Sequence, residues 1–330
     1  MSGKLSPGRQ RTAPKGRGTA VAHPESRIAI IGAGHVGATT AYALMLRALF
    51  SEIVLIDSNQ ALARAEAADL QDANALARPA AVWAGDYADA ATASIAVITA
   101  GGATHGSQAR LAVVADSATI VSGCVAGLID AGFDGIMVVA ANPVDIMALL
   151  AQRRSGLPAS RVIGTGTLLD TSRLKQALSR TLQVASSTVQ GLVLGEHGDS
   201  EVVAFSTLRV EGLSLDRLST PDLDEAEITQ EVRRAGYEII AGKGYTSFGV
   251  ATAIVHICEA IARNERTVLP VSTLLTGEFG ISGVYLSLPC VIGRSGVERV
   301  LSPALTDAET DLLRHSAEVL RKAAADIGLD

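Results

Sequence analysis

The sequence predicts an α/β protein in which a doubly wound parallel sheet over residues 26–163 is followed by a C-terminal α+β domain over residues 164–330. Three observations predict this class. Short apolar runs alternate with helical segments in the first half, a glycine-rich turn follows the first run, and the composition suits a large folded protein. With 330 residues, 48% of them hydrophobic and 19% charged, the chain can form about two domains with buried cores.

The predicted strands of the parallel sheet form a regular series. They occupy residues 27–31, 52–56, 80–84, 95–99 and 136–140, with helical segments between them. The first of these helices is expected to run from the glycine-rich turn to about residue 49. In such a sheet, ligands bind in the crevice beyond the carboxyl ends of the strands, so the residues that follow each strand are the candidate site.

Residues 1–25 differ from everything after them. They carry five basic residues and three prolines, with no acid before Glu25. A segment of this composition buries little apolar surface, so we expect a disordered basic tail, and weak binding of an anion or partner stays open. The tail lacks the apolar segment of a signal peptide, and no later run is apolar enough to span a membrane. We therefore expect no membrane partner and a cytoplasmic location.

Charge and cysteine usage exclude other classes of protein. The formal net charge is −6 and no basic stripe runs through the body of the chain, so a nucleic-acid partner is not expected. Cys124, Cys258 and Cys290 lie far apart among apolar neighbours, which predicts buried free thiols in a reducing compartment. No group of histidine, cysteine and carboxylate residues has metal-ligand spacing, so no metal is expected.

The glycine-rich turn has the spacing of a dinucleotide-binding motif. Gly32 permits a tight turn, Gly34 lets the backbone approach a pyrophosphate, and Gly37 allows the helix to pack closely on the strand. The helix N-terminus then faces the negative charge. Asp57 ends the second strand 20 residues beyond Gly37, within reach of the adenosine ribose. Because its carboxylate would repel a 2′-phosphate, NAD is favoured over NADP as the cofactor.

Polar residues also follow the later strands. Thr99 and Gly101 begin a glycine-rich loop that ends in Arg110, and Asn142 follows the fifth strand. These positions all fall at the carboxyl edge of the predicted sheet. They are therefore candidates for contact with the cofactor or a substrate.

The second half supplies an acid, an arginine and a histidine. Asp170 and Arg173 are three residues apart in a predicted helix and share one face, although a first-turn acid and a surface arginine would give the same pattern. His197 lies between glycines in GEHGDS, directly after the apolar run 191–194. Taken alone, this string could be a turn with a merely polar histidine. The 27 residues between Asp170 and His197 leave room for a helix and a returning strand that would bring the two side chains together.

Eight strings in order resemble the family of NAD-dependent L-lactate and L-malate dehydrogenases over about residues 26–325. They are GAGHVG, VLID, ITAG with the later arginine, NPVD, GTGTLLDTSR, GEHGDS, KGYTSF and LPCVIGRSGV. The last four resemble lactate dehydrogenases more than malate dehydrogenases. The resemblance implies a Rossmann fold and hydride transfer between NAD and a small 2-oxo or 2-hydroxy acid.

The resemblance also implies roles for individual residues. His197 would exchange a proton with the substrate oxygen while hydride moves to or from the nicotinamide, and Asp170 would accept a hydrogen bond from the other ring nitrogen. Arg173 would hold the substrate carboxylate through two parallel hydrogen bonds. Arg110 would close over the substrate with its loop and polarise the carbonyl.

The remaining positions implied by the resemblance line the two binding sites. Asn142 would orient both the substrate carbonyl and the nicotinamide side, so it belongs to the cofactor site as well, and Thr246 would line the substrate pocket. Thr99 and Gly101 join the glycines and Asp57 as cofactor-binding candidates.

Departures from the family bear on the identity of the acid. Thr104 stands where lactate dehydrogenases typically carry glutamine and malate dehydrogenases arginine, so a second substrate carboxylate would be buried unpaired. Gly236 occupies a pocket-side position that is often alanine. These small residues favour a monocarboxylic acid larger than pyruvate. Ordinary drift in a pyruvate reductase is the competing explanation.

Two alternatives to a lactate-type enzyme stay open. Within the family the alternative is malate dehydrogenase, and outside it a catalytically silent NAD-binding protein. Silence is disfavoured because the histidine, its acid and both arginines are all present. The alanine-rich segment 66–76 resembles the family's subunit-contact helix, so we expect a homo-oligomer, a tetramer or a dimer.

Overall fold

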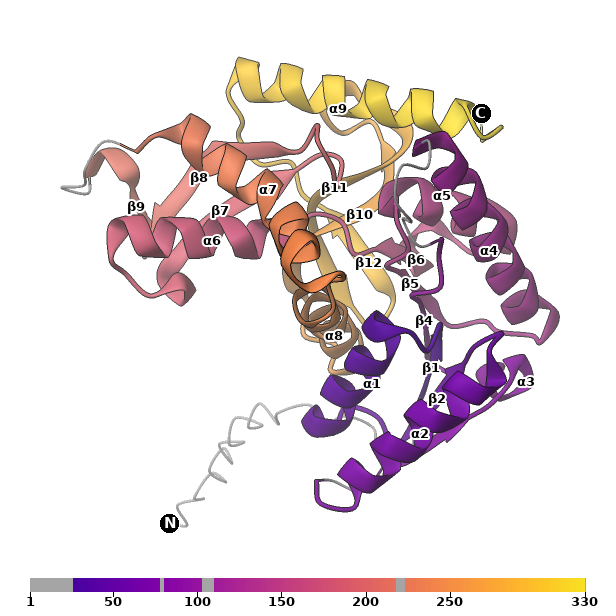
Figure 1. Ribbon diagram of the computed structural model, residues 1–330. Coiled ribbons are helices and arrows are strands. Elements are labelled where there is room, and N and C mark those ends of the chain that lie inside the picture. The colour runs from indigo at the N-terminus through magenta and orange to yellow at the C-terminus, as the bar shows by residue number, and fades with distance from the viewer. Residues whose placement is uncertain (1–25, 78–79, 103–109, 218–222, 330) are drawn as a thin grey trace, which may run out of the picture.

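The computed structural model describes residues 26–77, 80–102, 110–217 and 223–329, without the side chains of residues 110–113 and 216. The predicted basic tail, residues 1–25, lies outside these ranges. Within them the chain forms two sheets with helices packed around them (Figure 1).

The main sheet confirms the predicted doubly wound parallel arrangement. Among the described residues its order is β3-β2-β1-β4-β5-β6-β10-β11-β12, in which β1 to β6 run parallel and β10 to β12 continue the sheet antiparallel. The strands are β1 (Arg27–Ile31), β2 (Glu52–Ile56), β3 (Ala81–Ala84), β4 (Ile95–Ile98), β5 (Ile136–Val139), β6 (Val162–Gly164), β10 (Thr267–Thr276), β11 (Ser282–Gly293) and β12 (Gly296–Val300). The strand order reverses between β1 and β4, which places the ligand crevice at that point.

A second, three-stranded sheet confirms the mixed character of the C-terminal half. It consists of β7 (Val189–Leu194), β8 (Val202–Val210) and β9 (Leu213–Ser214), all antiparallel. An isolated bridge ties it to the main sheet, because the backbones of Gly195 and Ser287 exchange two hydrogen bonds of 3.1 and 3.0 Å. The turn that follows β7 is therefore fixed against β11.

Helices cover both faces of the main sheet. The described helices are α1 (His35–Arg47), α2 (Gln60–Asn74), α3 (Tyr87–Ala90), α4 (Arg110–Asp130), α5 (Val144–Ser155), α6 (Leu168–Leu182), α7 (Glu225–Lys243), α8 (Phe248–Ala262) and α9 (Asp307–Ala325). Among them, α6 and α7 form a separate apolar cluster with the second sheet. Short 3₁₀ turns occur at Ala159–Arg161, Ser186–Thr188, Leu215–Arg217 and Glu278–Gly280. The first helix ends two residues earlier than predicted, because Ala48 adopts a left-handed conformation with φ 50°.

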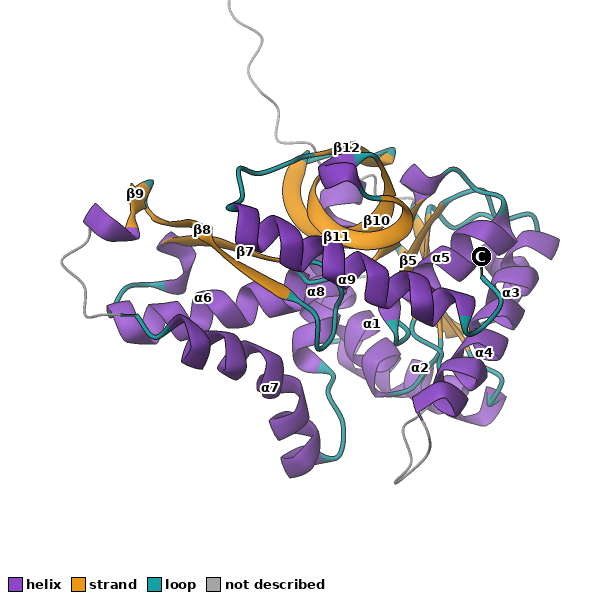
Figure 2. Cartoon of the chain, turned by 90° about the horizontal axis from the view of Figure 1, so that it is seen from above, coloured by secondary structure: helices purple, strands orange, loops and turns teal. Residues whose placement is uncertain are grey.

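Alternate residues of β1 show how the two faces are filled. Ile28 and Ile30 join an apolar cluster with α1, α2 and α8, whereas Ala29 and Ile31 join a cluster with α4, α5 and α9. Burial on both faces explains why the strands read as uninterrupted apolar runs. The views from the side and from above show the helices on either side of the strands, with α9 lying across β11 and ending near α5 (Figures 1 and 2).

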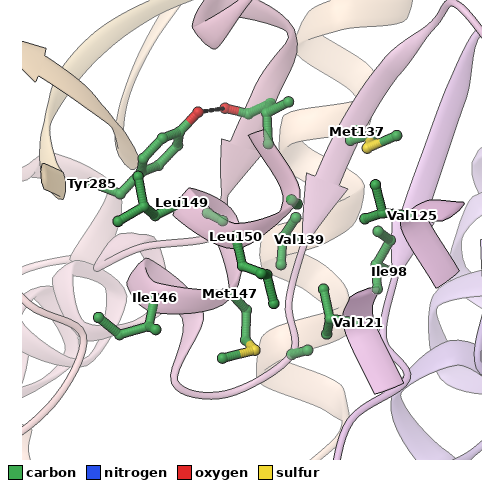
Figure 3. Close-up of a cluster of buried hydrophobic side chains, with 14 of the residues drawn as sticks. Ile98, Val121, Val125, Met137, Val139, Ile146, Met147, Leu149, Leu150 and Tyr285 are labelled. Carbon is green, nitrogen blue, oxygen red and sulfur yellow. Dashed lines mark hydrogen bonds between the residues drawn. The ribbon is translucent and has the colours of Figure 1, made fainter. Parts of the chain in front are cut away.

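The second cluster surrounds the helix that begins next to the candidate site. Met147, Leu149 and Leu150 of α5 pack between the sheet and α4, and Tyr285 of β11 closes the cluster (Figure 3). The Tyr285 hydroxyl donates a 3.2 Å hydrogen bond to the carbonyl oxygen of Val162, so its polar atom is satisfied within the core. This packing holds the start of α5 rigidly.

Two sequence expectations can be compared with the described chain. Cys124, Cys258 and Cys290 are buried free thiols, as predicted. In the described ranges no helix is both long and apolar enough to cross a membrane.

Candidate active site

The glycine-rich turn between β1 and α1 has the backbone that a pyrophosphate requires. Gly32 has φ +105°, and a Cβ on Gly37 would lie 1.8 Å from the Gly32 carbonyl oxygen, so neither position tolerates a side chain. A Cβ on Gly34 would meet nothing within 4 Å, which leaves open space beside the turn. Gly34 is the N-cap of α1 and no side chain of the described residues caps it. The turn thus fits a bound dinucleotide, because helix N–H groups are open to an anion.

Asp57 lies beside this turn at the end of β2. Its Oδ2 accepts a 2.7 Å hydrogen bond from the backbone of Ala33, and its Oδ1 accepts one of 2.8 Å from that of Asn59. A carboxylate has about four acceptor positions, so these bonds orient the half-buried group and leave lone pairs for ribose hydroxyls. The predicted pairing of the glycine turn with Asp57 is therefore present in space.

Thr99 is hydrogen-bonded to the start of the glycine-rich turn. Its hydroxyl donates to the carbonyl oxygens of Ile31, at 3.2 Å, and Gly32, at 2.9 Å, from the end of β4. Gly101 follows in the same segment, where a Cβ would lie 3.3 Å from the Cβ of Ala141. Both cofactor-binding candidates thus lie at the switch point of the sheet.

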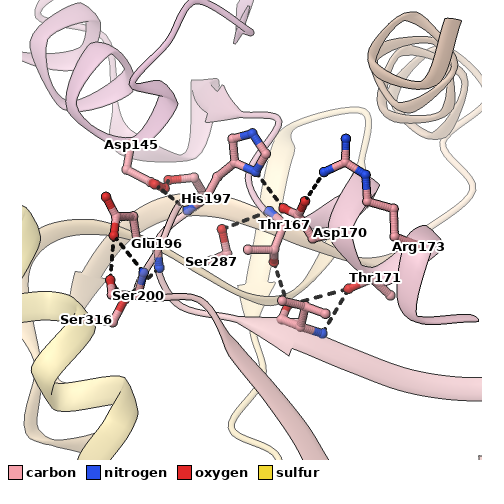
Figure 4. Close-up of polar contacts among 12 residues, drawn as sticks. Asp145, Thr167, Asp170, Thr171, Arg173, Glu196, His197, Ser200, Ser287 and Ser316 are labelled. Carbon is pink, nitrogen blue, oxygen red and sulfur yellow. Dashed lines mark hydrogen bonds and ion pairs between the residues drawn. The ribbon is translucent and has the colours of Figure 1, made fainter. Parts of the chain in front are cut away.

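His197, Asp170 and Arg173 form one continuous chain of contacts (Figure 4). His197 Nδ1 lies 2.5 Å from Asp170 Oδ2, and Arg173 donates a 2.7 Å hydrogen bond to Asp170 Oδ1. The Asp170 side chain is 2% exposed, whereas those of Arg173 and His197 are 17% and 27% exposed. The Asp170 carboxylate is therefore buried beneath the partly exposed side chains of Arg173 and His197. His197 Nε2 points away from this carboxylate.

Electrostatics set the protonation of this group. Burial lowers the pKa of His197, but the charge and hydrogen bond of Asp170 outweigh it and raise that pKa to about 9. Burial would raise the pKa of Asp170, yet the positive charges of His197 and Arg173 hold it below its ordinary value. At neutral pH the histidine is thus an imidazolium paired with a carboxylate, ready to donate a proton.

Local hydrogen bonds bring helix α6 and strand β7 together. The Thr167 hydroxyl donates a 2.5 Å hydrogen bond to the carbonyl oxygen of Val193, and the Thr171 hydroxyl accepts one of 3.0 Å from the Val193 N–H. These bonds set the start of α6 beside the end of β7. Asp170 and His197 meet across this junction (Figure 4).

The turn that carries His197 is tied down on both sides of it. Gly195 has φ +89°, and the Glu196 N–H donates a 2.7 Å hydrogen bond to the hydroxyl of Ser316 in α9. The Glu196 carboxylate in turn accepts hydrogen bonds from the backbone and the hydroxyl of Ser200. The GEHGDS string is thus a rigid turn, not a loose surface loop.

The remaining predicted residues fall into two groups. Asn142 is exposed between β5 and α5, Thr246 lies half-buried between α7 and α8, and Gly236 of α7 faces Arg173. Thr104 lies outside the described residues. Arg110 is the first residue of α4, but its side chain is not described.

Sequence reasoning missed two buried carboxylates near His197, those of Asp145 and Glu201. It also missed Ser272, whose hydroxyl donates a hydrogen bond to Asp145. Asp145 belongs to the NPVD string and bonds the backbone of His197, although no role was predicted for it. Glu201 is buried, and Arg233 donates a 2.8 Å hydrogen bond to its carbonyl oxygen. The position of Asp145 in NPVD was the only available signal, and spacing alone could not show its partner.

Hydride transfer to a small oxo acid requires a group that can donate a proton, a cation for the carboxylate and a site for a dinucleotide. The pair of His197 and Asp170, the neighbouring Arg173 and the glycine-rich turn after β1 fit these three requirements. The fold and site therefore define the class of NAD-dependent dehydrogenases. Comparison with known proteins narrows the class. Residues 26–164 match the NAD binding domain of the lactate/malate dehydrogenases, and residues 167–328 match the alpha/beta C-terminal domain of that family.

Individual relatives agree with this assignment. L-Lactate dehydrogenases of Clostridium botulinum strain 657 and Priestia megaterium are each 40% identical to the chain, over 90% and 91% of its length and 95% and 96% of theirs. The ligand-bound crystal structure of the minor L-lactate dehydrogenase from Enterococcus mundtii has a TM-score of 0.90 and 38% identity, covering 93% of this chain and 99% of that one. The chain belongs to the lactate/malate dehydrogenase family. It is an NAD-dependent 2-hydroxy acid dehydrogenase of the lactate dehydrogenase type.

Proposed function

We propose that the protein interconverts a 2-oxo monocarboxylic acid and its L-2-hydroxy acid, with His197 as the proton donor and acceptor. The observation that carries this proposal is the 2.5 Å contact between His197 Nδ1 and the buried Asp170. The contact fixes the ring, keeps it protonated at neutral pH and leaves Nε2 for the substrate.

The residues divide the work as follows. When bound, NADH supplies the hydride that reduces the carbonyl carbon. His197 gives the Nε2 proton to the carbonyl oxygen, and Asp170 stabilises the imidazolium before the transfer. In the direction of oxidation, neutral His197 takes the hydroxyl proton of the substrate. Asn142, exposed between β5 and α5, orients the carbonyl group.

Arginines recognise and polarise the acid. Arg173 gives one donor to Asp170, and a guanidinium has five, so a parallel pair can still bind the substrate carboxylate. Its partial burial strengthens that contact. Arg110 polarises the carbonyl and stabilises the negative charge that develops on its oxygen. Thr246 forms part of the pocket wall.

Cofactor recognition rests on the turn between β1 and α1. Gly32, Gly34 and Gly37 bring the helix N-terminus to the pyrophosphate, and Asp57 binds the ribose hydroxyls. Thr99 and Gly101 complete the cradle from the end of β4. The charge of Asp57 selects NAD over NADP.

The pocket favours an acid larger than pyruvate. A Cβ on Gly236 would lie 3.4 Å from one terminal nitrogen of Arg173, so glycine leaves space where the substrate carboxylate approaches. Thr104 offers no positive charge to a second carboxylate, which disfavours oxaloacetate and hence malate dehydrogenase activity.

A panel of substrates tests this proposal. NADH oxidation is followed with pyruvate, 2-oxobutyrate, 2-oxoisocaproate, phenylpyruvate and oxaloacetate, for the wild type and for Gly236→Ala. We expect kcat/KM to be higher for one of the larger monocarboxylates than for pyruvate, and the added methyl to lower that preference. A much higher kcat/KM for pyruvate than for the larger acids would contradict an enlarged pocket. Efficient reduction of oxaloacetate would contradict the assignment of a monocarboxylic substrate.

The organisation of the protein completes the proposal. Residues 26–163 form the cofactor domain and residues 164–330 the substrate domain, joined through the continuous main sheet. A homo-oligomer, tetramer or dimer, assembles through α2, and the protein acts in the cytoplasm on a small acid, without nucleic acid or membrane. Exposed Tyr42 and Leu46 on neighbouring α1 support an interface in this region. Light scattering of the purified protein tests the assembly.

A further inference from the structure

Asp145 lies directly behind the catalytic turn. It belongs to the first turn of α5, and its side chain is almost completely enclosed, with 2% of the residue exposed. Its Oδ2 accepts a 2.9 Å hydrogen bond from the backbone N–H of His197 (Figure 4). Its Oδ1 accepts a 2.5 Å hydrogen bond from the hydroxyl of Ser272 in β10.

These two bonds join three elements that are remote in sequence. Asp145 is 52 residues from His197 and 127 from Ser272, so α5, the turn after β7 and the strand β10 meet at one carboxylate. Burying a carboxylate costs free energy, and apolar packing at this position would be cheaper for stability alone. Here the buried carboxylate instead bonds the peptide of His197, the proposed proton donor.

The same helix start also faces the substrate side. Asn142, three residues before Asp145, is exposed at the carboxyl edge of the sheet, while Asp145 points into the protein. One rigid turn, held by the core around Leu149 and Leu150, therefore sets both the group that orients the carbonyl and the peptide that carries the imidazole.

We propose that Asp145 is a positioning residue, which fixes the backbone of His197 so that its imidazole meets the substrate oxygen in line with hydride transfer. Asp170 fixes the ring of His197, and Asp145 fixes the peptide beneath it. Ser272 anchors Asp145 from the second half of the chain. This inference rests on the role of His197 proposed above.

The charge of Asp145 also affects the protonation of His197, which gives the positioning role a second measurable consequence. Burial raises the pKa of Asp145 to about 6, while the bonds from Ser272 and His197 oppose this, so the group is ionised at neutral pH. The carboxylates that raise the pKa of His197 are Asp170 first, then Asp145 and Glu201. Glu196 also faces Asp145 and disfavours its charge. Removing only the charge of Asp145 should therefore move the pH at which His197 loses its proton.

Three variants of the full-length protein separate the contributions. Asp145→Ala removes both bonds, Asp145→Asn keeps an acceptor for the His197 N–H without the charge, and Ser272→Ala removes only the anchor. Measurements are kcat and KM for the 2-oxo acid, Kd for NADH by fluorescence titration, the melting temperature, and the pH profile of reduction. Asp134→Ala, an exposed carboxylate paired with Arg161, is the matched control.

We expect Asp145→Ala to lower kcat roughly 10- to 100-fold while KM and the Kd for NADH stay within about threefold of the wild type. Asp145→Asn should restore most of kcat and move the alkaline limb of the pH profile to lower pH. Ser272→Ala should lower kcat by a smaller factor. Asp134→Ala should change none of these quantities.

Other outcomes would overturn the positioning role. Unchanged kcat in Asp145→Ala would do so, as would a loss of kcat that is matched by an equal loss of NADH binding. If Asp145→Ala does not fold, the other two variants decide the question. In that case the positioning role of Asp145 is refuted when Asp145→Asn keeps the wild-type alkaline limb of its pH profile and Ser272→Ala keeps the wild-type kcat. His197→Asn separates the two proposals: if it keeps wild-type turnover the proposed function fails, whereas if it is inactive and Asp145→Ala is not, only this inference fails.

Discussion

Replacing Asp170 by asparagine tests the electrostatic core of the site. With His197 as the proposed proton donor, reduction requires the imidazolium form of the ring, so we expect wild-type activity to persist at neutral pH and to be lost as the pH rises through about 9. The gap between this value and the ordinary histidine pKa of about 6.5 corresponds to about 3 kcal/mol in favour of the charged ring. Asp170 is the largest favourable contribution, and burial opposes it.

The size of the effect follows from these values. Without the charge of Asp170, burial is opposed only by the weaker contributions of Asp145 and Glu201, so the pKa of His197 should fall toward its ordinary value of about 6.5. At that value roughly a tenth of the molecules would be protonated at pH 7.5, which lowers kcat/KM for reduction about tenfold. The loss of ring orientation adds to this effect. Part of the activity should return at pH 5.5. Oxidation of the hydroxy acid needs the neutral imidazole, and a lower pKa of His197 increases the neutral fraction. The change in protonation therefore does not slow oxidation in the variant.

The assay is the pH dependence of kcat/KM in both directions, followed by NADH absorbance. Asp134→Asn, an equivalent change at an exposed carboxylate, is the control and should leave the profile unchanged. If Asp170→Asn kept its alkaline limb near pH 9, the carboxylate would not be what holds the proton on His197, and the reasoning would be wrong.

Three further predictions concern binding. Arg173→Lys should raise KM for the oxo acid at least about 10-fold with little change in the Kd for NADH, because lysine cannot form the parallel pair; equal losses in both titrations would contradict the carboxylate contact. Asp57→Asn should weaken NADH about 10-fold and reduce its preference over NADPH, which fluorescence titration of both cofactors would check. Gly37→Ala should lower the melting temperature, because the Cβ would overlap the Gly32 carbonyl, whereas Gly34→Ala should keep the melting temperature and weaken NADH binding. Equal melting temperatures for these two variants would show that the turn does not have the described geometry.

Local chemistry explains what was predictable in the fold. The strands at 27–31 and 52–56 have the predicted bounds, because each is an apolar run that ends at a residue with a special backbone or side-chain role, Gly32 or Asp57. The strands predicted at 95–99 and 136–140 each end one residue earlier, where the chain turns toward the crevice. Such boundaries depend on tertiary contacts that periodicity does not contain.

The sequence by itself determined the parallel sheet, the dinucleotide turn and the identities of the acid, arginine and histidine, because each is written in a short string with its own chemistry. Only the tertiary structure decided which of them touch. Asp170 meets His197 because α6 and β7 are bonded at Val193, and Asp145 reaches the His197 peptide because α5 packs under a turn 52 residues away. Spacing along a chain sets periodicity and turns, but distances across a core depend on how separate elements pack, which no single string encodes.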